Sequence, residues 1–194
     1  WDNVSPEILG DPSYVNIAAE ASIDVTTRVL TVEVEGYFTS DGATSNNINV
    51  ALLQNYVEGP QIGSSYNPTQ ILPNGNYNHM HMLRHMLTGQ WGDVTTATTS
   101  GTLYQNTLTY TIPADLNGVS YELFDLEVVV FVSEGQTEVI SGSEASMDYI
   151  VPAGINLIDL GAATNMAMPS DYCDDNLTPE ITVTNNSLIV VDTF

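Results

Sequence analysis

The chain alternates apolar and polar residues over most of its length, which is the pattern of β-strands with one buried face. One face of the first such stretch is formed by Val15, Ile17, Ala19, Ala21 and Ile23. The next stretch, residues 28–38, turns Leu30, Val32, Val34 and Phe38 to one side and Thr31, Glu33 and Glu35 to the other. Residues 24–27 between the two stretches predict a hairpin turn.

Further strands are predicted over residues 47–54, 107–114 and 124–132. The last of these is apolar on both faces, as expected of a strand in the centre of a sheet. Residues 137–151 predict two short strands or one bulged strand. Turn dipeptides such as Asp41-Gly42 and Asn117-Gly118 separate these stretches.

The predicted fold class is therefore all-β: an antiparallel β-sandwich of the jelly-roll or immunoglobulin-like type. We expect the sandwich over residues 13–152, preceded by a linker over residues 1–12. Residues 153–172 are rich in small side chains and predict a second linker. Residues 173–194 then predict the start of a second, incomplete β-module.

Charge changes this picture by excluding classes of partner. The 194 residues include 24 Asp and Glu but only two Lys and Arg, for a net charge of −22. Such a field repels phosphate, so we expect no nucleic-acid partner and no direct insertion into an anionic membrane. Only 13% of the residues are charged, and the surface must be built of Asn, Thr, Ser, Gln and Tyr, a composition typical of secreted β-proteins. This composition favours an extracellular location. Because the chain opens on Trp1 rather than Met, we also expect a processed or excised piece of a longer protein.

Residues 76–87 hold all three histidines and three of the six methionines of the chain. On one continuous strand, His79, His81 and His85 would share one face, with the methionines and Arg84 on the other. His79 and His81 are then candidate ligands for zinc or copper. The favoured alternative is a structural strand, whose histidines bond to backbone carbonyls or tyrosine hydroxyls and whose methionines fill gaps in the core.

Clustered carboxylates give a second candidate site. Residues 40–47 and 171–176 gather oxygen ligands of the kind that calcium prefers, although neither has the spacing of an EF-hand loop. Asp174 and Asp175 are the stronger pair because they lie near a predicted domain junction. The alternative is that both stretches are ordinary solvated loops. No cofactor other than calcium is expected.

Aromatic residues give a third candidate. Tyr56, Tyr66, Tyr77 and Trp91 lie in or beside the predicted loops around residues 76–87, among many Asn and Gln residues that could bind a carbohydrate. Their alternative role is ordinary packing at the corners of the sandwich. Catalysis is not expected, because Cys173 has no neighbouring histidine and no nucleophile elbow or phosphate loop is present.

Residues 52–93 carry a recognisable motif: Tyr-x-His-x-His-x-Leu-Arg followed by Gly-x-Trp-Gly-Asp. The matching residues are Leu53, Gln61, Tyr77, His79, His81, Leu83, Arg84, Gly89, Trp91, Gly92 and Asp93. This stretch resembles the C-terminal β-domain of the Omp28-related outer membrane proteins of Bacteroidota, as do residues 121–145. Residues 173–187 resemble the start of an immunoglobulin-like module. Met80 stands where the family commonly has Asn, and His85 is not part of the motif.

The resemblance implies export, association with the outer membrane or cell surface, and delivery by type IX secretion. The family's thioredoxin-like domain has no counterpart here, so no redox activity is expected. The sequence thus predicts a non-catalytic, secreted cell-surface module that serves adhesion, assembly or display through contacts with other protein chains or cell-surface components. The alternatives are a calcium-dependent module that binds glycans and a copper or zinc protein.

Overall fold

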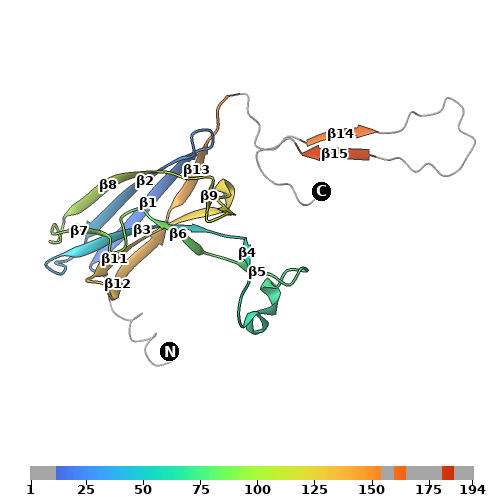
Figure 1. The fold of residues 1–194 in the computed structure, drawn as a ribbon. Coiled ribbons are helices and arrows are strands. Elements are labelled where there is room, and N and C mark those ends of the chain that lie inside the picture. Colours follow the sequence, from blue (N-terminus) through green and yellow to red (C-terminus); the bar gives the residue numbers. More distant parts are fainter. Residues whose placement is uncertain (1–11, 154–159, 165–180, 186–194) are drawn as a thin grey trace, which may run out of the picture. The chain divides into compact units, whose positions relative to one another are not determined.

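The alternating stretches of the sequence form the strands of a two-sheet sandwich in a computed structural model (Figure 1). The structure describes residues 12–153, 160–164 and 181–185. Contacts divide the chain into two compact units, residues 1–150 and residues 151–194. The predicted all-β sandwich is confirmed, and it lies in the first unit.

The first sheet has the strand order β13-β1-β2-β8. Its members are β1 (Val15–Asp24), β2 (Val29–Phe38), β8 (Leu103–Thr111) and β13 (Ser146–Ile150). The predicted hairpin joins β1 to β2, which pair along their whole length without a register shift. β8 continues the sheet on the far side of β2.

The second sheet has the strand order β12-β11-β3-β6. Its members are β3 (Asn46–Gln54), β6 (Met82–Met86), β11 (Leu126–Glu134) and β12 (Glu138–Glu144), and β7 (Asp93–Thr95) pairs with the first residues of β3. β11 lies between β3 and β12, as its two apolar faces predict. A short hairpin of β9 (Asp115–Leu116) and β10 (Val119–Ser120) and a 3-10 turn, η3 (Leu123–Asp125), connect β8 to β11.

The core lies between the sheets and is built by the alternate residues that the sequence places inward. On β1 and β2 these are Val15, Ile17, Ala19, Ala21, Ile23, Leu30, Val32, Val34 and Phe38, all less than 10% exposed. The second sheet contributes Ile48, Val50, Leu52, Val128, Val130 and Val132. Burial of a large apolar side chain stabilises a fold by roughly 1.5–3 kcal/mol, so this core holds the two sheets together.

One strand pair departs from the purely antiparallel prediction. Residues 137–151 form two strands, β12 in the second sheet and β13 in the first, and the chain crosses between the sheets at the buried Ala145. The backbone N–H of Ala145 donates to the carbonyl of Val128 over 2.8 Å. This crossing brings β13 alongside β1 in the parallel direction. Strands that change sheet at a bend are a common way to close the corner of a sandwich.

The second unit contains an antiparallel hairpin of β14 (Leu160–Thr164) and β15 (Ile181–Asn185). β14 falls within residues 153–172, for which the sequence predicts a linker. β15, the strand that pairs with β14, follows some twenty residues later, so this pairing could not be predicted from the local sequence pattern. Residues 1–11 and the greater part of residues 173–194 lie outside the described residues. Within the described part, no helix is long and apolar enough to cross a membrane.

Candidate functional site

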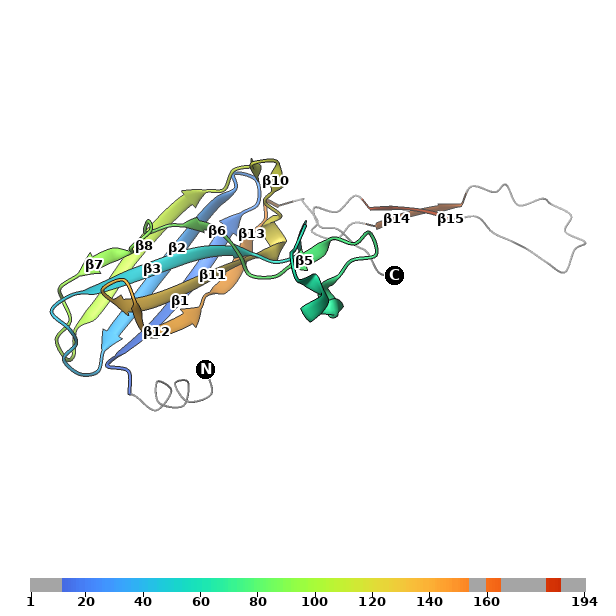
Figure 2. The same cartoon turned by 60° about the horizontal axis from the view of Figure 1, so that its bottom comes forward.

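Residues 55–81, called the arm below, leave the sandwich after β3 and return to it at β6. The arm contains β4 (Val57–Gly59), two 3-10 turns, η1 (Ser64–Tyr66) and η2 (Pro68–Gln70), and β5 (Tyr77–His79). β4 and β5 pair with each other rather than with either sheet of the sandwich. Figures 1 and 2 both show the arm extending beyond the end of the sandwich.

The root of the arm is held by one carboxylate. Glu127 on β11 accepts a hydrogen bond from the side-chain amide of Asn55, and its other oxygen lies 2.7 Å from Nδ1 of His81. The side-chain oxygen of Asn55 accepts from the backbone N–H of His81 over 2.8 Å. Glu127 therefore joins the outgoing and the returning chain of the arm to the central strand of the second sheet.

The backbone turns sharply at both ends of the arm. Tyr56 and His81 have φ angles of 57° and 52°, in the left-handed region that residues other than glycine rarely adopt. Such a residue costs free energy unless its surroundings hold it. At His81 the bonds to Asn55 and Glu127 supply that restraint. The direction of the arm is thus set by two strained residues and one carboxylate.

Within the arm, a second carboxylate connects the outgoing segment to the returning segment. One oxygen of Glu58 on β4 accepts hydrogen bonds from the side-chain amides of Asn76 and Asn74, over 2.6 and 2.8 Å. These bonds favour the ionised form and lower the pKa of Glu58 below its ordinary value of 4.5. Tyr77 is fixed in the same way, because its hydroxyl accepts from the side-chain amide of Asn67.

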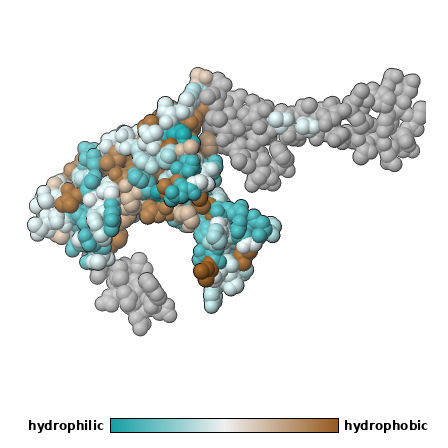
Figure 3. Space-filling view, viewed as in Figure 1, coloured by the Kyte–Doolittle hydropathy of each residue, from teal (hydrophilic) through white to brown (hydrophobic). Residues whose placement is uncertain are grey.

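The far part of the arm exposes large side chains. Ile62 is 99% exposed and Tyr66 is 94% exposed, while Tyr56 near the root is 62% exposed. Figure 3 shows apolar surface at the end of the arm, surrounded by polar surface. Exposed apolar groups on a rigid projection are typical of a contact site, since their burial against a partner is favourable.

The histidines do not share one face, and the premise of a continuous strand is wrong. The chain breaks between β5 and β6 at the left-handed His81. A bulge follows, because Leu52 pairs with His85 and Leu53 pairs with Leu83, which leaves Arg84 as an extra residue. An inserted residue shifts every later side chain by one position. Residues at even spacing therefore do not share a face of the strand across the bulge.

Each histidine therefore has different neighbours. The ring of His79 lies 5.0 Å from the ring of Tyr77, and the ring of His85 stacks on Tyr110 of the first sheet at 4.1 Å. His81 pairs with Glu127. Among the described residues, no group of three or more His, Cys, Asp or Glu side chains could hold a metal ion. A metal bound by His79 and His81 stays a prediction.

Arg84 is buried by the bulge and completes the attachment of β6. It is 7% exposed, its guanidinium lies 4.1 Å from the centre of the Tyr121 ring, and one of its N–H groups donates to the carbonyl of Val119. Tyr121 in turn donates from its hydroxyl to the carbonyl of Arg84. This buried cation binds the second sheet to the β9–β10 hairpin.

The predicted aromatic residues separate into two places. Tyr56, Tyr66 and Tyr77 all belong to the arm, but Trp91 does not. Trp91 is 51% exposed and, with Phe131 and Val139, lines a hollow of about 170 Å³ on the second sheet. The next residue, Gly92, lies against Asn49 of β3, because a side chain at Gly92 would clash with Asn49. Asn49 lies five residues before the end of β3, which is about 16 Å along the strand from the arm.

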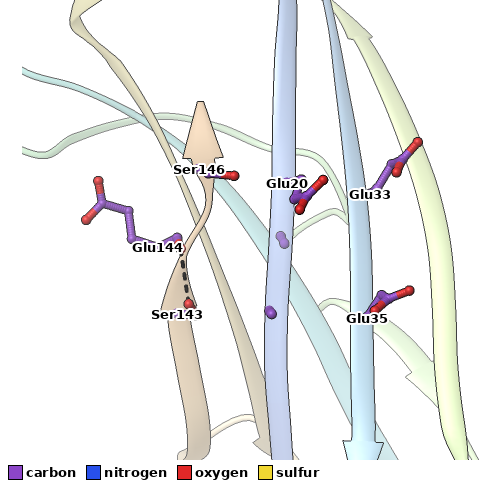
Figure 4. A pocket seen from close by; sticks show the side chains of 8 residues that line it. Glu20, Glu33, Glu35, Ser143, Glu144 and Ser146 are labelled. Carbon is purple, nitrogen blue, oxygen red and sulfur yellow. Dashed lines mark hydrogen bonds between the residues drawn. The ribbon is translucent and has the colours of Figure 1, made fainter. Parts of the chain in front are cut away.

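A larger hollow, of about 370 Å³, lies on the outer face of the first sheet. Figure 4 shows Glu20 on β1 beside Glu33 and Glu35 on β2, with Glu144, Ser143 and Ser146 on the other side. Glu20 and Glu33 are directly opposite each other in the β1–β2 pair. Glu35 accepts a hydrogen bond from the side chain of Gln105 on β8 over 2.6 Å. The hollow is shallow and lined by acidic, hydroxyl and methyl groups.

Of the two candidate calcium sites, one lies outside the described residues and the other lies within the sandwich. Asp174 and Asp175 lie outside the described residues, so calcium at that place stays a prediction. In residues 40–47, the carboxylate of Asp41 accepts from the backbone N–H of Ser100 over 2.8 Å. The neighbouring Gly42 donates to the carbonyl of Thr98. Asp41 therefore ties two loops of the sandwich together.

The residues that hold the arm are not predicted by the sequence pattern. Asn55 and Glu127 are separated by 72 positions, and neither belongs to a motif. Glu127 had one usable signal, since it is one of two carboxylates, with Asp125, in the otherwise apolar stretch 124–132. A charge at such a position calls for a partner.

The fold and this arrangement define a class of protein: a two-sheet β-sandwich with a projecting arm that is anchored by polar side chains. The family model of the outer membrane protein Omp28 matches residues 1–148, and the chain belongs to this family. It is therefore a cell-surface or outer-membrane protein. A search of curated proteins and a search of solved structures both find no match.

Proposed function

We propose that this chain is a non-catalytic, secreted module of a larger cell-surface protein, and that it uses its arm to bind another protein in adhesion or assembly. The observation that carries the proposal is the exposure of Ile62 and Tyr66 on an arm whose root is fixed by Glu127. A fixed arm loses little conformational entropy on binding, so most of the free energy of burial is available for affinity.

The chemistry of the arm favours a protein partner over a glycan. Sugars stack on aromatic faces, and Tyr66 offers one, but Ile62 offers only an aliphatic surface. A mixed aliphatic and aromatic contact is typical of the buried centre of a protein interface. Glycan binding through Tyr56, Tyr66 and Tyr77 is the second candidate, supported by the exposure of Tyr66 and Tyr56.

Two further parts of the proposal rest on other support. Export by the type IX secretion system, in a bacterium of the Bacteroidota, rests on the resemblance in residues 52–93. The non-catalytic role rests on the sequence, in which Cys173 has no neighbouring histidine and no nucleophile elbow is present.

The test is binding of the fluorescently labelled full chain to intact cells of the producing bacterium that lack their own copy. The arm variant Ile62→Ser/Tyr66→Ser is compared with Ile150→Ser/Tyr37→Ser, which removes the same residue types from exposed positions on the sandwich. We expect the arm variant to lose at least about tenfold in affinity, as for truncation of two interface anchors. The control should bind as the unmodified chain does.

The same assay separates the two classes of partner. Protease treatment of the cells should abolish binding, and glycosidase treatment should leave it unchanged. The opposite pattern would establish the glycan candidate instead. Equal binding by the arm variant and the control variant would show that the arm is not the contact site.

A further inference from the structure

The edge of β8 that faces away from β2 has no partner strand among the described residues. β8 is the last strand of the first sheet, and it pairs with β2 over nine residues without a register shift. The N–H of Ile112 donates to the carbonyl of Arg28, and the N–H of Phe38 donates to the carbonyl of Thr102. In an antiparallel pair such bonded positions alternate, so the even-numbered residues of β8 bond to β2.

The odd-numbered residues consequently direct their backbone groups away from β2. These residues are Leu103, Gln105, Thr107, Thr109 and Thr111. Within the described residues, none of their backbone N–H groups donates a hydrogen bond to another segment. They form a straight row of donors and acceptors at the margin of the sheet, which Figure 1 shows at the outer side of β2.

The other edge strands carry features that discourage pairing, and β8 carries none. β12 has a bulge in its pairing with β11 and ends in Glu138 and Glu144. β13 has five residues and includes Asp148, β6 is interrupted by the bulge at Arg84, and β7 has three residues. By contrast, β8 reads Leu-Tyr-Gln-Asn-Thr-Leu-Thr-Tyr-Thr, with no charge, proline or glycine. A long, regular, uncharged edge is a template for an added strand.

The two faces of β8 specify what kind of strand would fit. On the inner face, Tyr104, Leu108 and Tyr110 are only partly buried although they pack against the core. An added strand with apolar residues on that face would cover them. On the outer face, β2 presents Glu33 and Glu35 beside Thr107 and Gln105. These carboxylates would lie about 10 Å from the added strand, close enough to attract lysine or arginine side chains.

No second copy of the described chain can supply those cations. The protein has no lysine, and both of its arginines are engaged. Arg28 donates to the carbonyls of Ile112, Pro113 and Tyr121, and Arg84 is buried against Tyr121. We therefore propose that the free edge of β8 binds an extended segment of another protein that alternates apolar with basic residues. This site is separate from the arm, and it does not depend on the proposed role of the arm.

The experiment uses the full chain and a nine-residue synthetic peptide that alternates lysine and valine. An acidic twin with glutamate in place of lysine is the matched control. Amide hydrogen exchange gives the direct readout. We expect Leu103, Gln105, Thr107 and Thr109 to exchange quickly in the free chain and to become protected when the basic peptide is added. The even-numbered residues of β8 should be protected in both states.

Three variants separate the contributions. Thr107→Pro removes an outward N–H and should weaken peptide binding by at least about tenfold, because proline blocks an added ladder. If this variant fails to fold, Thr107→Lys serves instead, since a lysine there repels the basic peptide. Glu33→Gln/Glu35→Gln should weaken binding several-fold and reduce its dependence on salt.

The proposal is overturned if the peptide does not bind, if the acidic twin binds equally well, or if Thr107→Pro leaves binding unchanged. It is also overturned if the outward amides are already protected in a concentration-dependent dimer that Thr107→Pro dissociates. That result would make a second copy the occupant of the edge. None of these outcomes depends on Ile62 or Tyr66, so failure here is distinguishable from failure of the binding arm.

Discussion

At the residue scale, a few polar side chains decide where the arm points. Glu127 bonds to Asn55 on the outgoing chain and to His81 on the returning chain. The side chain of His81 is 64% exposed and that of Glu127 is 22% exposed, so the contact between them adds little to global stability. Its effect is local: it selects one orientation of the arm.

Replacement of Glu127 by Gln therefore tests orientation separately from stability. We expect Glu127→Gln to speed hydrogen exchange of the His81 amide and of the arm by roughly tenfold or less, with a change in the free energy of unfolding below about 1 kcal/mol. Hydrogen-exchange mass spectrometry and chemical denaturation measure the two quantities. Glu138→Gln, at an exposed position of β12, is the control. Equal exchange rates in both variants would show that Glu127 does not fix the orientation of the arm.

Arg84 is the motif residue with the largest expected effect on stability. Arg84→Ala removes a part-buried hydrogen bond to Val119, a cation–π contact with Tyr121 and apolar packing of the side-chain stem. We expect a loss of about 2–4 kcal/mol in the free energy of unfolding. The neighbouring Leu83 is 56% exposed, and Leu83→Ala should cost less than about 1 kcal/mol. Similar losses for both variants, measured by denaturation, would contradict the assigned role.

At the element scale, the strands follow from local pattern, but their interruptions do not. The inward residues of β1 and β2 are those that alternation predicts. The break at His81 and the bulge at Arg84 could not be predicted, because both residues fit an extended strand by type. They are fixed by Asn55, Glu127 and Tyr121, which are distant in sequence.

The candidate site was predicted in part for the same reason. The tyrosines of the arm stood out because aromatic residues cluster near residues 76–87. Trp91 was grouped with them by sequence distance, although β3 separates the two places along its length. Ile62 was missed because a single aliphatic residue in a loop has no distinguishing signal in sequence.

We expect the arm to be sensitive to acid, because the carboxylate of Glu58 on β4 holds the segment that leads into β5. The lowered pKa of Glu58 means that its carboxylate stabilises the folded arm fully above its ordinary pKa of 4.5. This contribution is lost as the pH falls through the lowered pKa of the folded state. We expect limited proteolysis of the arm by an acid-active protease to accelerate below about pH 4 in the unmodified chain.

The matched variant for this prediction is Glu58→Gln, which cannot ionise. Its arm should be cut at a rate that varies less with pH, and it should be cut faster than the unmodified arm at pH 5. The same pH dependence in both chains would assign the effect to other carboxylates, such as Asp24, whose pKa is also lowered by the backbone N–H groups of Thr27 and Thr26.

At the scale of the whole molecule, the net charge of −22 acts against the compact state. The repulsion is direct where Glu20 faces Glu33 across β1 and β2, and Glu134 faces Glu138 in the same way across β11 and β12. Like charges in directly opposed positions destabilise a sheet by roughly 0.2–1 kcal/mol. The acidic face therefore lowers the stability of the folded chain.

Removal of one of these charges should stabilise the protein. We expect Glu33→Gln to raise the melting temperature at low salt by about 1–4 °C. The gain should shrink at high salt, where the repulsion is screened. Glu35→Gln is the control, because Glu35 faces Ala18 and accepts a hydrogen bond from Gln105. A larger gain from Glu35→Gln would contradict the assignment of the repulsion to the Glu20–Glu33 pair.

We propose above that this sandwich binds other proteins through its arm. The most direct measurement places a photo-crosslinking amino acid at position 62, 66 or 139 of the chain on living cells. Position 139 is an exposed apolar site of the sandwich, where Val139 is 59% exposed. We expect one discrete protein adduct from positions 62 and 66 and none from position 139. Adducts from position 139 alone would contradict it.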